Sequence, residues 1–195
     1  MIIGITGGTG SGKTTLLRKI QAMGGLILDC DAIYHHLLET DTALLSALEA
    51  RFPGTVVGGE LDRKKLGSIV FSDPSALRDL NQITHAAVKA KVLQALETEP
   101  NLAAIDAIAL HEGGLAELCD ITVAITAPEN LRIARLMQRE GITEEYAQAR
   151  IRAQHDNEWY RQQCSHTLEN SGTLSDFEGK CLAFLESLGI MKENQ

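Results

Sequence analysis

The sequence predicts an α/β fold built on a parallel β-sheet of about five strands. Five short apolar runs each suit one buried strand, and helical patterns separate most of them along the chain. Buried strands that alternate with helices form a parallel sheet with helices on both faces. The expected strands cover residues 2–5, 26–28, 102–110, 121–126 and 166–168.

A glycine-rich segment links the first expected strand to the first expected helix. Residues 7–14 read Gly-Gly-Thr-Gly-Ser-Gly-Lys-Thr and fit the P-loop pattern G-x-x-x-x-G-K-[ST]. A strand that turns through glycines into a helix directs backbone N–H groups, and the positive end of the helix dipole, at one phosphate. Lys13 is expected to reach the β- and γ-phosphates, and Thr14 to offer its hydroxyl to Mg²⁺. The expected nucleotide contacts are Gly8, Gly10, Ser11, Gly12, Lys13, Thr14 and Thr15.

Apolar spacing predicts helices between these strands. Gly24 and Gly25 end the first helix, and a serine or aspartate before Pro74 is a typical helix entry. Four glycine and proline residues make residues 52–60 a loop or hairpin. Helices are expected over residues 15–23, 32–50, 61–71, from 74, 84–96, from 128, from a Thr143 cap, and 174–188.

Composition limits the class of partner. The 195 residues include 18 basic and 26 acidic side chains, so the net charge is −8, and only 4% of residues are aromatic. An acidic chain with few aromatic side chains is a poor match for nucleic acid. A small phosphorylated ligand remains compatible, because a P-loop and local arginines can hold it against an acidic background.

The cysteines and the N-terminal residues indicate the compartment. Four cysteines occur without a C-x-x-C pair or zinc-ligand spacing, so free thiols in a reducing cytoplasm are expected. Glycine interrupts the N-terminal apolar run, which favours a core strand over a signal peptide. No apolar stretch approaches the roughly 20 residues that span a bilayer, so no membrane partner is expected.

Six ordered segments resemble the dephospho-coenzyme A kinase family over nearly the whole chain. The P-loop opens the series, and Asp29-Cys30-Asp31 is similar to the Asp-x-Asp that follows the family's second strand. The remaining segments that are similar to family motifs are residues 59–74, 83–85, 135–139 with 152–154, and 170–172. The chain departs from the family pattern at Ala86, at Ile108 to His111, and at Asn157, where Arg161 could replace a missing lid arginine.

The resemblance implies a P-loop kinase with a helical insertion and a helical lid. The core would comprise residues 1–31, 98–129 and 163–195, the substrate subdomain residues 32–97, and the lid residues 130–162. The implied reaction moves the γ-phosphate of ATP, with Mg²⁺, to the ribose 3′-hydroxyl of dephospho-coenzyme A. A monomer or weak oligomer is expected.

The resemblance also implies roles for individual residues. Asp31 would be the base that takes the hydroxyl proton, with Asp29 pointing the same way along the strand; the alternative is a pair of carboxylates that cap the next helix. Arg139 would stabilise charge on the transferring phosphoryl group, on the same helix face as Arg135. Asn170 and Gly172 would lie near the adenine, and Arg63, His85 and Glu112 would bind the substrate, with a purely structural role for His85 equally open. For Arg132, Arg150 and Arg152 a solvated basic face is favoured.

Two other functions remain as alternatives. Another small-molecule kinase of this fold, of the nucleoside or nucleotide type, would keep the P-loop and lid but accept a different hydroxyl; residues 59–85 argue against it. A regulator that binds a nucleotide without turnover is disfavoured because both Lys13 and Asp31 are present. No sequence feature separates ATP from GTP as donor.

Overall fold

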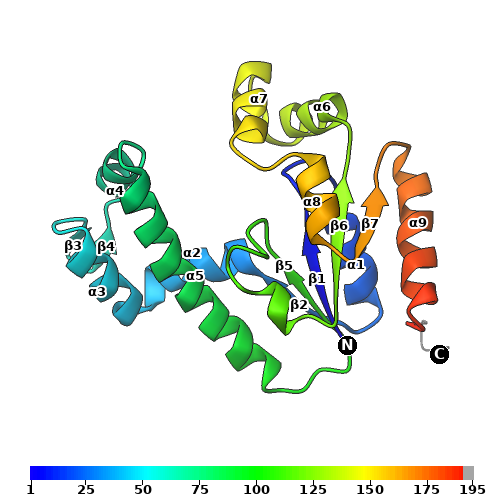
Figure 1. Cartoon of the computed structure of the whole chain (residues 1–195), viewed down its shortest axis with the longest axis horizontal. Coiled ribbons are helices and arrows are strands. Elements are labelled where there is room, and N and C mark those ends of the chain that lie inside the picture. The colour runs from blue at the N-terminus through cyan, green and yellow to red at the C-terminus, as the bar shows by residue number, and fades with distance from the viewer. Residues whose placement is uncertain (191–195) are drawn as a thin grey trace. The chain divides into compact units, whose positions relative to one another are not determined.

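A computed structural model describes residues 1–190, which divide into two compact units. The first unit comprises Met1–Leu28 and the residues from Pro100 on, and the second comprises Asp29–Glu99. Figure 1 colours both along the chain. Within the described residues, no helix has both the length and the apolar character that crossing a membrane requires.

The first unit is built on the expected five-stranded parallel sheet. Its order is β2-β5-β1-β6-β7, with β1 between β5 and β6 (Figure 1). Parallel register pairs Ile3 with Ala104 and with Ile121, and Val123 with His166. The strands are β1 (Ile2–Thr6), β2 (Leu26–Asp29), β5 (Ala103–Asp106), β6 (Ile121–Thr126) and β7 (His166–Glu169).

Two helices cover one face of this sheet. Alternate residues of β1, Ile3 and Ile5, are fully buried against α1 (Lys13–Ala22) and α9 (Leu174–Ser187). Leu16 and Ile20 of α1 share this core with the buried Phe177 of α9. Successive side chains of a strand point to opposite faces of the sheet, so the burial of Ile3 and Ile5 fixes which face of β1 lies against these helices. It thereby fixes the direction in which the following loop leaves β1.

Three further helices lie between β6 and β7. They are α6 (Glu129–Glu140), α7 (Glu144–Arg152) and α8 (Asn157–Gln163), and a short 3-10 turn, η1 (Ala116–Leu118), precedes β6. Gly141 ends α6 in a left-handed conformation with φ 66°, and the Thr143 hydroxyl caps α7 as expected, accepting from Tyr146 N–H. Leu136 packs with Ala147 and Ile151, which holds α6 against α7 (Figure 1).

The second unit is helical, with one two-stranded hairpin. Its longest helix, α5, packs against α2, α3 and α4. The expected hairpin between residues 52 and 60 is present as antiparallel pairing of β3 and β4. The elements are α2 (Cys30–Thr40), α3 (Thr42–Arg51), β3 (Val56–Val57), β4 (Glu60–Leu61), α4 (Arg63–Val70) and α5 (Pro74–Leu96).

Three expectations about these elements were wrong. The single helix over residues 32–50 is two helices, because the Asp41 carboxylate accepts from Ala43 and Leu44 N–H and starts a new helix. The separate helix over residues 84–96 is the second half of α5, which continues without a break from Pro74. The strand over residues 102–110 ends at Asp106, since the chain then turns and Leu110 accepts backbone bonds from Leu115 and Ala116.

The expected geometry of Asp29 and Asp31 was also wrong. Helix α2 begins at Cys30, so Asp31 lies in its first turn and does not continue strand β2. Asp29 is the N-cap, and its carboxylate accepts from Ala32 N–H at 3.0 Å. The two carboxylates therefore have different local environments and do not share a strand face.

Candidate active site

The segment between β1 and α1 forms a cradle of backbone N–H groups. Two of its N–H groups form backbone hydrogen bonds. That of Ser11 donates to Gly8 O at 3.2 Å, and that of Thr15 donates to Gly12 O at 3.0 Å. Within the described residues, no group accepts from the N–H of Gly10, Gly12, Lys13 or Thr14. Unsatisfied N–H groups at a helix N-terminus are the donors that bind a phosphate.

Glycine is required at two positions of this loop. Gly7 has φ 137°, and a Cβ there would lie 2.1 Å from the carbonyl oxygen of Ile125 in β6. Gly12 has φ 102°, and its Cβ would lie 2.3 Å from Nδ2 of Asn170. The loop therefore combines a left-handed backbone with close contact to its neighbours, and both demands exclude a side chain.

Lys13 and Thr14, the first residues of α1, carry the functional side chains of the loop. The Lys13 ammonium donates to Gly7 O at 3.0 Å, so it already lies over the cradle. Thr14 is exposed, and its hydroxyl has no partner among the described residues. A hydroxyl oxygen at this helix end is a suitable ligand for Mg²⁺, which prefers oxygen and keeps several waters.

Arg132 departs from the expected solvated face, which was wrong for this residue. It is 3% exposed, and its Nε donates to Thr9 O at 2.8 Å. Burial lowers the pKa of the guanidinium, because a charge is disfavoured away from water. The Arg132 side chain therefore extends from α6 and packs against the P-loop. The periodicity of the sequence did not indicate its burial.

Arg135 and Asn170 fix the second half of the P-loop. The Arg135 guanidinium donates to Asn170 Oδ1 at 3.0 Å and lies 3.4 Å from the carbonyls of Gly10 and Ser11. The Asn170 amide donates to Ser11 O at 2.9 Å, and this side chain is 5% exposed. Gly172 is exposed, two residues farther along. Asn170 thus contacts the P-loop backbone through its amide nitrogen and Arg135 through its amide oxygen.

Two arginines of α6 and α7 share one carboxylate. Arg139 and Arg150 both form ion pairs with Glu140, and the hydrogen bond from Arg139 is the main cause that lowers the pKa of this carboxyl. The Arg139 side chain is 59% exposed, so it can move to a ligand at little cost. Arg152 is exposed and donates to Gln148 at 3.3 Å, as a solvated residue would.

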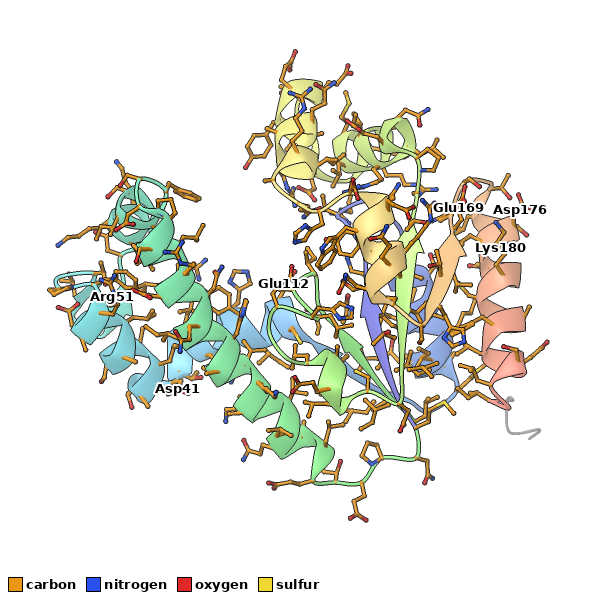
Figure 2. The ribbon with its side chains drawn as sticks, in the orientation of Figure 1. Asp41, Arg51, Glu112, Glu169, Asp176 and Lys180 are labelled. Atoms are coloured by element: carbon orange, nitrogen blue, oxygen red, sulfur yellow. The ribbon has the colours of Figure 1, made fainter. Side chains whose placement is uncertain are left out.

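Aromatic and histidine side chains surround Glu112, on the loop after β5 (Figure 2). His155 Nε2 lies 3.0 Å from Glu112 Oε1, and the His155 ring stacks on Trp159 with centroids 3.7 Å apart. His111 Nε2 lies 3.5 Å from Cys164 Sγ, and burial lowers the pKa of His111 although Glu112 opposes the shift. The sequence gave no sign of this grouping, because its members come from segments more than 40 residues apart.

Asn157 and Arg161 lie outside the P-loop contacts. The Asn157 amide donates to Ala127 O at 2.9 Å and so fixes the start of α8 to the end of β6. Arg161 forms ion pairs of 3.6 Å with Glu158 and Glu169. In this structure Arg161 therefore has carboxylate partners on α8 and β7.

The remaining expected site residues lie in the second unit. Asp31 is exposed in the first turn of α2, and its carboxylate has no partner among the described residues. Arg63 is the exposed first residue of α4, and its charge lies close enough to Tyr34 to oppose the rise that burial causes in that phenol's pKa. His85 is half-buried in the middle of α5.

A model of the dephospho-CoA kinase family matches residues 1–176. The chain belongs to the dephospho-CoA kinase family. It is 38% identical over 193 residues to the dephospho-CoA kinase of Deinococcus radiodurans, a match that covers 96% of this chain and 92% of the relative. The family identifies the chain as an ATP-dependent kinase of coenzyme A biosynthesis (EC 2.7.1.24).

Solved structures support the same family. TT1252 from Thermus thermophilus superposes with a TM-score of 0.80 at 36% identity, and the match covers 96% of this chain and 97% of that protein. The dephospho-CoA kinase from Campylobacter jejuni superposes with a TM-score of 0.68 at 28% identity, covering 97% and 98% of the two chains. The expected α/β P-loop kinase fold is therefore confirmed.

Proposed function

We propose that the chain performs the reaction of the dephospho-CoA kinase family with the P-loop, Asp31 and Arg139 as its working groups. The reaction moves the γ-phosphate of ATP to the ribose 3′-hydroxyl of dephospho-CoA. The observation that carries this proposal is the set of four N–H groups, from Gly10 to Thr14, that have no acceptor in the described residues. N–H groups without an acceptor at a helix N-terminus are the donors that bind a phosphate.

The P-loop holds the donor in this proposal. The four N–H groups bind phosphate oxygens, and Lys13 exchanges its bond to Gly7 O for one to the β- and γ-phosphates. Thr14 Oγ1 is the residue that would hold Mg²⁺, and its lack of a protein partner suits that role. When bound, Mg²⁺ neutralises charge on the phosphates.

Asp31 is the proposed base for the acceptor hydroxyl. A ribose hydroxyl attacks poorly while neutral, so a carboxylate must take its proton as the new bond to phosphorus forms. Asp29 is committed to capping α2, whereas the Asp31 carboxylate is exposed and has no partner in the described residues. The different environments of the two carboxylates support Asp31.

Six further residues complete the proposal. Arg139 leaves Glu140 and stabilises the charge that develops on the transferring phosphoryl group. Arg63 and Glu112, both exposed, bind the substrate. His85 either joins them or orders α5, and its half-buried position is compatible with both. Asn170 and Gly172 are proposed to lie beside the adenine.

The proposal also covers the cellular compartment, the oligomeric state and the classes of partner. None of the four cysteines, all of which lie within the described residues, forms a disulfide, which supports a reducing cytoplasm. We further propose that the chain acts as a monomer or weak oligomer and that nucleic acid and membranes are not its partners, which agrees with its net charge of −8.

The test is phosphoryl transfer by the purified chain with Mg²⁺ and ATP. Dephospho-CoA is offered beside a panel of nucleosides and nucleoside monophosphates, with GTP as an alternative donor. Selective turnover of dephospho-CoA is expected. Selective turnover of a nucleoside would favour another kinase of this fold, and ATP binding without any transfer would favour a regulator.

A further inference from the structure

Thr9, a residue of the P-loop, is hydrogen-bonded through both its backbone N–H and its backbone carbonyl. Its N–H donates to Gln154 Oε1 at 2.8 Å, and its carbonyl accepts from Arg132 Nε at 2.8 Å. The ring closes because Arg132 Nη2 donates to the same Gln154 oxygen at 3.2 Å. The Thr9 side chain is 7% exposed, so the ring is largely shielded from water.

Arg132 supports the loop by packing as well as by hydrogen bonding. A Cβ on Gly8 would lie 2.1 Å from Arg132 Nη2, so the guanidinium contacts the loop backbone directly. A Cβ on Gly10 would lie 2.8 Å from the Arg132 carbonyl oxygen. Arg132 has no carboxylate partner within the described residues, and Gln154 supplies an oxygen to its charge instead.

The two side chains that hold Thr9 come from the two ends of the α6–α7 pair. Arg132 lies in the first turn of α6, and Gln154 follows directly after α7 and its C-cap Ala153. Both ends of the α6–α7 pair are thus bonded to one residue of the phosphate loop. Arg135, one turn farther along α6, also contacts the loop, at the carbonyls of Gly10 and Ser11.

We propose that Arg132 and Gln154 are positioning residues that hold Thr9 so that the N–H groups of Gly10, Gly12, Lys13 and Thr14 converge on a phosphate. This proposal rests on the proposed function of the P-loop as the ATP site. Since the Thr9 N–H is already bonded to Gln154, it is not one of the phosphate donors. A loop without this restraint would have to order itself on each binding event, which weakens affinity.

The test is calorimetric titration of ADP with Mg²⁺ into the full chain carrying Gln154→Met. Methionine keeps the length of the side chain and removes the oxygen. Loss of a partly buried acceptor shared by two donors is expected to raise the ADP Kd about tenfold. The KM for dephospho-CoA should stay within about twofold, because the Gln154 side chain bonds to Thr9 and Arg132 and is not among the residues proposed to bind the acceptor.

Two further variants separate positioning from general stability. Gln162→Met makes the same change at an exposed position of α8, where the glutamine donates to Glu158 at 3.2 Å, and should leave the ADP Kd unchanged. Gln154→Glu restores an oxygen beside Arg132 and should return the Kd to within about threefold of the original. A change of ADP Kd in Gln154→Met with little change in thermal midpoint supports positioning.

An ADP Kd in Gln154→Met equal to that of the unaltered chain would overturn the proposal. Equal weakening by Gln154→Met and Gln154→Glu would overturn it too, because the shared oxygen would not then be the cause. Turnover of dephospho-CoA by the unaltered chain is measured in parallel. It reports on the proposed function separately, whatever the variants do.

Discussion

Arg135 and Asn170 are bonded side chain to side chain, at 3.0 Å from guanidinium to amide oxygen. The other end of the Asn170 amide donates to Ser11 O at 2.9 Å, so α6 and the residue after β7 meet at the P-loop. The amide nitrogen carries a second N–H, and the amide oxygen a second lone pair. Asn170 can therefore contact adenine, as proposed, while both of these bonds persist.

Gly12→Ala should destabilise the chain and weaken nucleotide binding. A side chain at φ 102° costs about 1–2 kcal/mol, and the new Cβ would displace the Asn170 amide. Urea denaturation and ADP titration measure both effects. The control is Gly179→Ala in α9, where a Cβ meets nothing within 4 Å and the free energy of unfolding should rise by about 0.5–1 kcal/mol. Equal behaviour of the two variants would contradict the role of Gly12.

Lys13→Ala should lower kcat by about 10²–10³, because the ammonium that neutralises the phosphates is lost. Steady-state transfer from ATP measures it. Lys19→Ala removes a lysine from the same helix, where it pairs with Glu178 at 3.2 Å, and should keep nearly full activity. An unaffected rate in Lys13→Ala would refute the assignment.

Asp31→Asn should lower kcat by about 10²–10⁴ and leave ATP affinity unchanged, because the variant keeps the shape of the side chain and loses the base. Single-turnover transfer and ATP titration separate the two quantities. Asp73→Asn is the matched control, since Asp73 caps α5 and asparagine caps a helix equally well. Near-normal turnover in Asp31→Asn would remove Asp31 as the base.

Arg139→Ala and Arg150→Ala remove two arginines that share the Glu140 carboxylate. Only Arg139 is proposed to reach the phosphoryl group, so its removal should lower kcat by about 10²–10³. Arg150→Ala should leave kcat within about threefold, because it loses only an ion pair with Glu140. Rate measurements at saturating ATP compare them, and a larger loss in Arg150→Ala would reverse the assignment.

His111 should make stability depend on pH below neutrality. Burial lowers its pKa from the usual 6.5, so the unfolded chain binds this proton more readily than the folded chain does. Stability is therefore full above about pH 6.5 and falls as the pH decreases toward the folded pKa. Urea unfolding of the unaltered chain and of His111→Gln, compared with pH 8 as reference, should show a shallower slope in the variant. Identical slopes would exclude His111 as a source.

Local signals were enough to predict the phosphate loop and the sheet. A P-loop depends on glycine spacing between an apolar strand and a helix, and all of these lie within residues 2–23. The five strands are short apolar runs, so their existence followed from composition along the chain. Their order in the sheet depends on contacts across the chain, which local patterns do not show.

Capping and burial explain most of the errors. Asp29 and Asp41 end one element and begin the next through bonds to N–H groups two or three residues away, which apolar periodicity does not detect. Arg132 was expected on a solvated basic face in the company of the acidic residues Glu140, Glu144 and Glu145. Its burial is a tertiary effect, since its partners Thr9 and Gln154 lie 123 and 22 residues away.

Because the Lys13 ammonium is bonded to the Gly7 carbonyl, nucleotide binding exchanges this hydrogen bond for one to a phosphate. A phosphate that arrives at the loop takes over a cation that already has an acceptor, so one charge-assisted bond is lost as another forms. The heat released on binding is then smaller than the final contacts suggest. Without a nucleotide, the same bond keeps the positive charge at the loop and limits its attraction for other anions.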